Sequence, residues 1–332
     1  MQKNTIICSI IGIELDEPIQ EIRFGPARLY LNPVLASNPH NWQDQIPGGG
    51  FVLLYKDEGP VSFPTPVVKF HFDVEFETQK LRMPHPLPHA HAALIKGLLP
   101  LLLGTKGDIL RGETIIGIGT RDEVVSNAAW ATSDGAGIDA SLLRRHTRTV
   151  KIDKADCEKL QELSQKIHSV SLDTFNIPIS IFVNSYYRVN PADRGIDLLT
   201  ALESLLSEGP ESISMKVSLR AACLLEREGK KRKRIYEVVK EAYKHRNSLV
   251  HGSKKRPAAA EWFRNNGDDL EDIVRKTLYL IVELLAQGIE LIPKKVDKYL
   301  FDSGLLDTNA VIPTCEDIGS LIHLPPPPTI ML

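Results

Sequence analysis

The chain has 332 residues, of which 42% are hydrophobic and 25% charged, a composition typical of a globular protein and not of a disordered one. Its formal net charge of −2 excludes a surface that is basic throughout, yet the segment 211–260 holds 14 Lys or Arg against 5 Asp or Glu. That segment carries +9 and leaves −11 for the rest of the chain. A basic segment on an acidic chain indicates a partner with localised negative charge.

The scattered cysteines predict neither a disulfide framework nor a zinc site of thiolates. They are Cys8, Cys157, Cys223 and Cys315. The longest leucine-rich run, 94–104, contains Lys96 and Pro100 and is well short of the roughly 20 apolar residues that span a bilayer. The N-terminal segment has no evident signal-peptide cleavage site. We therefore expect a cytoplasmic protein without a membrane partner.

The first 150 or so residues have the pattern of strands and turns. In 67–77 (VVKFHFDVEFE) apolar and polar residues alternate, which places one set of side chains on a buried face. Further strands are expected over 6–15, 27–32, 49–59 and 114–120, with one helix over 90–103. These segments predict a β-rich N-terminal domain over 1–153.

From about residue 154 the apolar residues take on a helical period. Asn176 and Asn190 stand where helix caps are expected, each followed within two residues by a proline suited to a first helical turn. Helices are then predicted over 191–207, 213–227, 233–251 and 268–291. The fold class is therefore expected to be α+β: the β-rich domain, an all-α bundle over 154–300, and a proline-rich tail over 301–332.

The third of these four helices ends in the sequence HRNSLVHG. Projected at about 100° per residue, Arg246 lies in the middle of its apolar face. Tyr243, Asn247 and His251 form the next stripe, at four-residue spacing. Gly252 suits a left-handed helix end, so His251 is expected at the helix C-terminus, where the dipole favours the imidazolium.

Two further charges fall on apolar helix faces, Glu203 on 191–207 and Arg220 on 213–227. A buried charge has to be paired, because an unpaired one costs several kcal/mol. If the three helices pack together, one carboxylate faces two guanidiniums, and the surplus charge favours an anion such as phosphate. The pattern also fits arginines that reach solvent, a structural Glu203–Arg220 pair and an ordinary His-Gly cap, and spacing alone does not decide.

Three segments, in their order along the chain, resemble the Apea-like branch of the HEPN superfamily over roughly residues 177–291. They are LTALESLL, KVSLRAACLLE and IYEVVKEAYKHRNSLVHG. Its most specific element is the Arg-x4-His signature of Arg246 and His251, with Asn247 directly after the arginine. The ALE and LRAA segments of the two preceding helices are accessory matches. The resemblance implies a HEPN helical bundle that dimerises and so brings two signatures into one cleft.

The resemblance also implies a metal-independent endoribonuclease of toxin–antitoxin, CRISPR or phage-defence systems, with Arg246 and His251 as the catalytic pair and Asn247 as a polar supporter. Glu203, Arg220 and Tyr243 are expected to support the pair. RNA, a second copy of the chain and an antitoxin or defence-system protein are the expected partners, and no cofactor is expected. The alternative is a catalytically silent HEPN dimer that binds RNA or nucleotide, or serves as a protein-interaction module.

Cleavage of RNA without a metal requires the ribose 2′-hydroxyl to attack its own phosphate. A histidine that titrates near neutrality can take the proton from that oxygen or deliver one to the departing 5′-oxygen. A fixed guanidinium stabilises the extra negative charge of the transition state. Arg246 and His251 lie about 140° apart on an ideal helix, which favours a cleft shared by two subunits.

Basic runs flank the helix that carries the signature and are expected to hold the RNA backbone, although a solvated loop would have the same composition. Their residues are Lys231, Arg232, Lys233, Arg234, Lys254, Lys255 and Arg256.

The histidines of HPLPHAH, with His71 on a nearby strand, have spacings that zinc ligands can show. The proline-rich context and the lack of a nearby cysteine favour a loop leading into the helix, so no metal site is predicted.

Overall fold

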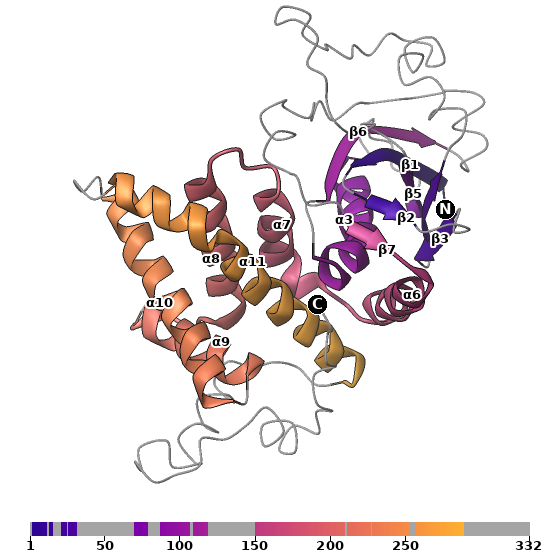
Figure 1. Cartoon of the computed structure of the whole chain (residues 1–332). Coiled ribbons are helices and arrows are strands. Elements are labelled where there is room, and N and C mark those ends of the chain that lie inside the picture. Colours follow the sequence, from indigo (N-terminus) through magenta and orange to yellow (C-terminus); the bar gives the residue numbers. More distant parts are fainter. Residues whose placement is uncertain are drawn as a thin grey trace, which may run out of the picture. The chain divides into compact units, whose positions relative to one another are not determined.

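The computed structural model describes residues 2–11, 13–15, 21–24, 26–31, 70–78, 87–106, 109–118, 150–209, 211–226, 228–251 and 256–288. It divides the chain into two compact units, Met1–His168 and Ser169–Leu332. Several predicted features lie outside the described residues: the strand over 49–59, His85, Gly252, Lys254, Lys255 and the tail over 301–332. Strands belong to the first unit, and the helices of the second unit are packed as a bundle (Figure 1).

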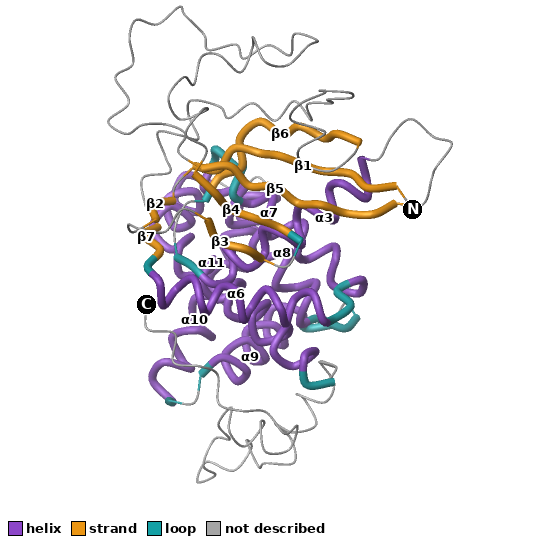
Figure 2. Tube along the Cα trace, turned by 90° about the vertical axis from the view of Figure 1, so that its right-hand side faces the viewer, coloured by secondary structure: helices purple, strands orange, loops and turns teal. Residues whose placement is uncertain are grey.

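The first unit contains a five-stranded antiparallel sheet, drawn in orange in Figure 2. In order across the sheet its strands are β3 (Glu21–Phe24), β4 (Ala27–Leu31), β5 (Phe70–Thr78), β1 (Gln2–Ile11) and β6 (Leu110–Ile118). Ile6 of β1 pairs with Val74 of β5 on one side and with Ile116 of β6 on the other. The strands predicted over 27–32, 67–77 and 114–120 are therefore confirmed within the described residues. The single strand predicted over 6–15 is wrong, because its second half, Ile13–Leu15, is a separate strand in another sheet.

A short parallel pair and two helices complete the described part of this unit. The pair joins β2 (Ile13–Leu15) to β7 (Val150–Ile152), and the helices are α3 (Leu87–Gly104) and α6 (Lys154–Ser169). Leu160, Leu163 and Ile167 form the buried stripe of α6, at the spacing expected of an amphipathic helix. A side chain at Gly104 would overlap Leu160, so this glycine permits the close approach of α3 and α6.

The second unit is helical throughout its described length. Its elements are η1 (Asp173–Phe175), α7 (Asn176–Ser185), α8 (Pro191–Leu206), α9 (Ile213–Leu225), α10 (Gly229–Val250) and α11 (Arg256–Ala286). The long helix α11 packs against α8 and α10, while α7 packs on α8 and α9 on α10. No helix in the described residues is long and apolar enough to cross a membrane.

The predicted helix starts are confirmed for α8 and α9 and wrong for α7, α10 and α11; α10 begins at Gly229 and not at 233. The side chain of Asn190 accepts a hydrogen bond from the amide of Ala192 at 2.9 Å, so α8 has the predicted cap. Asn176 is not a cap, because η1 runs directly into α7 and Phe175 holds the cap position. Helix α11 begins at Arg256 and not at 268. Ala259 and Phe263 are buried, so the apolar face of this helix continues on the N-terminal side of the polar sequence RNNGDD, residues 264–269.

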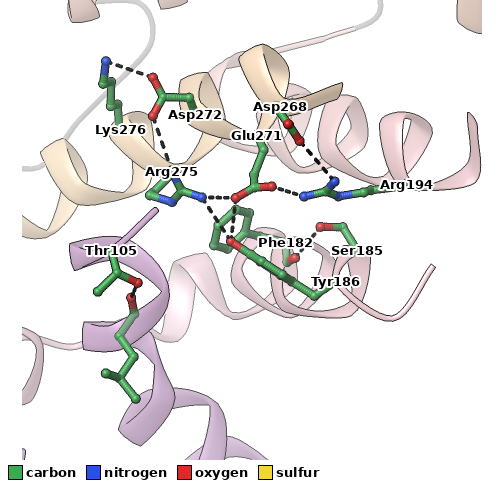
Figure 3. A network of polar contacts seen from close by, with 11 residues as sticks. Thr105, Phe182, Ser185, Tyr186, Arg194, Asp268, Glu271, Asp272, Arg275 and Lys276 are labelled. Carbon is green, nitrogen blue, oxygen red and sulfur yellow. Dashed lines mark hydrogen bonds and ion pairs between the residues drawn. The ribbon is translucent and has the colours of Figure 1, made fainter. Parts of the chain in front are cut away.

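A buried ion network fixes α11 against α7 and α8, and Figure 3 shows it from close by. The carboxylate of Glu271 lies between the guanidiniums of Arg194, on α8, and Arg275, on α11. Tyr186, at the end of α7, donates its hydroxyl proton to Glu271 at 2.9 Å. All four residues are at most 5% exposed. Asp268 and Asp272 neutralise the outer sides of the two arginines, each at 3.5 Å.

We expect Glu271→Gln to lower the free energy of unfolding by about 3–5 kcal/mol, because two guanidiniums would remain buried without their shared carboxylate. Asp269→Asn, two positions away, is the matched control: it breaks the exposed Arg234–Asp269 pair and is expected to cost less than about 1 kcal/mol. Urea denaturation followed by circular dichroism measures both. Equal losses in the two variants would contradict the role given to the network.

Two glycines in helices are expected to respond in opposite directions to alanine. A side chain at Gly195 of α8 would overlap the ring of Phe263, whereas nothing lies within 4 Å of the corresponding position at Gly267 of α11. Gly195→Ala should therefore destabilise the protein by about 1–3 kcal/mol through overpacking. Gly267→Ala should stabilise it by about 0.5–1 kcal/mol through helix propensity. Paired thermal melts check both, and a stabilising Gly195→Ala would show that the α8–α11 contact is looser than described.

Candidate functional site

The residues of the signature lie near the C-terminal end of α10. Val239 and Ala242 are fully buried and fix the rotation of this helix within the bundle. Tyr243, one residue further on, is 5% exposed and directs its hydroxyl toward α8, where it donates to Oε2 of Glu203 at 3.3 Å. The helix projection therefore predicted correctly that α8 and α10 bring their polar residues together.

Burial keeps the Tyr243 hydroxyl protonated. Desolvation raises the pKa of this phenol strongly, and the neighbouring Glu203 carboxylate raises it further, while Arg246 acts in the opposite direction. The hydroxyl therefore serves as a hydrogen-bond donor to Glu203 near neutral pH. Tyr243 holds the carboxylate in place and is poorly suited to act as a base.

Arg246 faces the same carboxylate, but at longer range. Its Nη1 lies 4.0 Å from Oε2 of Glu203, and the two side chains are 33% and 24% exposed. This guanidinium makes no other hydrogen bond or ion pair with the described residues. Arg246 is thus positioned by the helix and loosely compensated, with donors left over for a second anion.

Arg220 does not join this cluster. It is 1% exposed, and its guanidinium donates to the carbonyl of Leu206, the last residue of α8. The carbonyls at a helix C-terminus carry partial negative charge and lack partners within the helix, which suits a buried cation. The expected arrangement of one carboxylate facing two guanidiniums is therefore corrected: Glu203 faces Arg246 and Tyr243, and Arg220 caps α8.

His251 terminates α10, as the projection predicted. It is the C-cap residue, and its amide donates to the carbonyl of Asn247 at 3.0 Å. The side chains of both residues are exposed and make no hydrogen bond or ion pair with the described residues. His251 and Arg246 point to different sides of the helix, about 140° apart, so one chain alone does not bring the imidazole and the guanidinium to a single phosphate.

The basic run at the start of α10 is largely compensated within the protein. Its ion pairs are Lys231–Glu228 at 2.9 Å, Lys233–Glu237 at 3.7 Å and Arg234–Asp269 at 2.9 Å. Arg232 was expected to contact RNA, but it is 5% exposed and its Nε donates to the carbonyl of Glu226 at 2.9 Å. Arg232 lies seven residues, about two turns, before the buried Val239 and hence on the same face of α10. This position explains why Arg232 is buried and the prediction of an RNA contact is wrong. Arg256 is exposed at the start of α11.

The other histidine of the motif stretch has a packing role that the sequence did not reveal. The ring of His245 stacks on Trp262 of α11, with ring centroids 5.0 Å apart and planes 17° from parallel. Burial lowers the pKa of His245, which favours the neutral ring. The Glu241 carboxylate raises this pKa and the Lys244 ammonium lowers it, each to a smaller extent than burial. A projection of α10 could have suggested this, because His245 lies about 100° from Arg246.

Among the described residues, no three His, Cys, Asp or Glu side chains are grouped so that they could hold a metal ion. The side chains of His85, His89 and His91 lie outside that description.

No family model, curated protein or solved structure matches the chain. What the protein does has therefore to be inferred from the chemistry of the side chains on α8 and α10.

We expect Glu203→Gln to raise the affinity of the site for inorganic phosphate about fivefold or more. The reason is that Glu203 competes with phosphate for the guanidinium of Arg246, and two unit charges 4 Å apart attract each other by about 1 kcal/mol even in bulk water. Tyr243→Phe is the control, because it removes the hydroxyl and leaves both charges. Titration with phosphate, followed by NMR of the arginine side chains, measures the affinity. Equal affinities for Glu203→Gln and the wild type would show that Glu203 does not compete for the guanidinium.

Proposed function

We propose that the second unit is a HEPN-like endoribonuclease that cleaves RNA without a metal at a cleft shared by two copies of the chain. The observation that carries this proposal is the end of α10, where an exposed imidazole without a partner among the described residues follows five residues after a loosely compensated guanidinium. These are the two groups that a metal-free attack by the 2′-hydroxyl needs.

The roles follow from the contacts of each residue. His251 is free to take a proton from the attacking 2′-hydroxyl or to give one to the departing 5′-oxygen. Arg246 stabilises the charge that builds up on the phosphorus oxygens. Asn247 is exposed next to Arg246 and supports binding of the backbone, while Glu203 and Tyr243 hold Arg246 in position through the contacts described above.

A second copy resolves the separation of the two catalytic groups. A two-fold axis lets Arg246 of one chain and His251 of its partner face the same phosphate. Val250 supports this assembly. It is an apolar residue directly before His251 and is 61% exposed, and the α10 helix of a second copy, packed against this end, would cover it. The dimer is thus proposed to form through the C-terminal end of α10.

We include the cellular location and the biological role of the protein in this proposal. A ribonuclease of this kind would act in the cytoplasm as a phage-defence effector or toxin, restrained by an antitoxin or a defence-system protein. One observation favours the second candidate, a catalytically silent HEPN dimer that binds RNA or nucleotide: Glu203 already occupies one side of Arg246 in the free protein. The two candidates differ in whether RNA is cut.

An RNA cleavage assay in EDTA separates these candidates. The wild type is expected to cut labelled RNA and to leave a 2′,3′-cyclic phosphate and a 5′-hydroxyl, the products of 2′-hydroxyl attack. Arg246→Ala and His251→Ala are expected to lose activity by about 10²-fold or more. Binding without cleavage by all three proteins would leave the silent dimer, and absence of both binding and cleavage would overturn the proposal.

Mixing the two inactive variants tests the shared cleft. In a mixed dimer one site lacks both groups and the other retains Arg246 from one chain and His251 from its partner. Random exchange of equal amounts should therefore restore about a quarter of the wild-type activity. A mixture that stays inactive after subunit exchange would show that each chain needs both groups in its own site.

A further inference from the structure

One side of α10 presents a row of polar side chains that leads to His251. We define the α10 stripe as Lys233, Tyr236, Lys240, Asn247 and His251. These residues are separated by three, four or seven positions and so lie on one side of the helix. The stripe extends over about 27 Å at 1.5 Å per residue. Lys233, Lys240, Asn247 and His251 are exposed and Tyr236 is half-buried, while Tyr243, at the edge of the row, and Val239 and Ala242, on another side, are buried.

The stripe carries two lysines: Lys233, which belongs to the basic run, and Lys240, which lies beyond it. Lys231 and Arg234 each have a carboxylate at 2.9 Å, whereas the Lys233 ammonium lies 3.7 Å from Glu237. Lys240 contacts no carboxylate among the described residues. Its ammonium instead lies over the ring of Tyr236, 5.4 Å from the centroid. The ring orients Lys240 without cancelling its charge.

The two exposed lysines of this row can contact the phosphates of one nucleic-acid strand. Phosphates are contacted by such side chains regardless of base sequence, and a single row follows a single strand. The row ends at Asn247 and His251, whose side chains have no partner in the described part of the chain. Lys240 is eleven residues, or about 16 Å, from His251 along the helix axis, so it would contact a phosphate away from the one that is cut.

We propose that the α10 stripe is the track along which the backbone of a single-stranded RNA reaches the catalytic end of α10, with Lys240 as its main phosphate contact. This inference rests on the proposed ribonuclease function and assigns the substrate to one face of the site. It replaces the basic run around Lys231 as the expected backbone contact, because there the lysine is already neutralised and Arg232 is buried.

The test compares Lys240→Gln with Lys231→Gln, two lysines of the same helix that undergo the same loss of charge. Lys231 is the matched control because its exposed ammonium is held by Glu228. Binding of a single-stranded oligodeoxynucleotide, which offers the same phosphates but no 2′-hydroxyl to attack, is measured over a range of salt concentrations. Each lost phosphate contact on a single strand lowers the slope of log K against log salt by about 0.7.

The expected result is a slope smaller by about 0.7 for Lys240→Gln and an unchanged slope for Lys231→Gln, with circular dichroism showing both proteins folded. Equal slopes for Lys240→Gln and the wild type, or an equal loss in the two variants, would overturn the track. The ribonuclease proposal would survive that outcome, provided that the wild type still cleaves RNA in EDTA. A wild type that neither binds the strand nor cleaves RNA would remove both proposals.

Discussion

The buried carboxylate of Glu271 is the interaction on which the geometry of the second unit depends. It joins three helices, because Arg194 reaches it from α8, Tyr186 from the end of α7, and Arg275 from its own helix. A buried charge tolerates little displacement, since any loss of a partner leaves it uncompensated in a medium of low dielectric constant. On α8, Glu203 follows Arg194 by nine residues, about two and a half turns, and so faces the opposite side of the helix. The anchor on α11 thereby fixes the direction in which Glu203 faces α10.

The arginines of this unit differ in how fully the protein uses them. Arg220 neutralises the end of α8, and Arg232 donates to the carbonyl of Glu226 just beyond α9. Both occupy places where backbone carbonyls gather, and both are almost completely buried. Arg246 is held at 4.0 Å by a half-exposed carboxylate and retains contact with solvent. Of these three guanidiniums, it is the one that remains available to a phosphate.

Periodicity predicted the parts of the structure that one element determines by itself. Alternation located β5, the Asn190–Pro191 pair located the start of α8, and the projection of α10 placed Tyr243 beside Arg246. Contacts between helices were predicted only in part: Glu203 was expected to face Arg246, but the network around Glu271 was missed. Glu271 and Arg275 are four residues apart, which is the spacing of an ordinary surface ion pair. It is the packing of α7 and α8 against α11 that buries this pair. A projection identifies a face, but it does not identify the helix that covers it.

The proposed shared cleft and the proposed track along α10 would together impose a direction on an RNA substrate. An RNA strand has a 5′ and a 3′ end, whereas a two-fold axis relates two copies that are equivalent. A strand that follows one stripe toward His251 passes Arg246 of the partner and then meets the partner's stripe in the opposite sense. The two copies therefore cannot hold one strand identically. On this proposal a dimer binds one strand productively at a time, and the second stripe is left for the other end of the strand or for a partner protein.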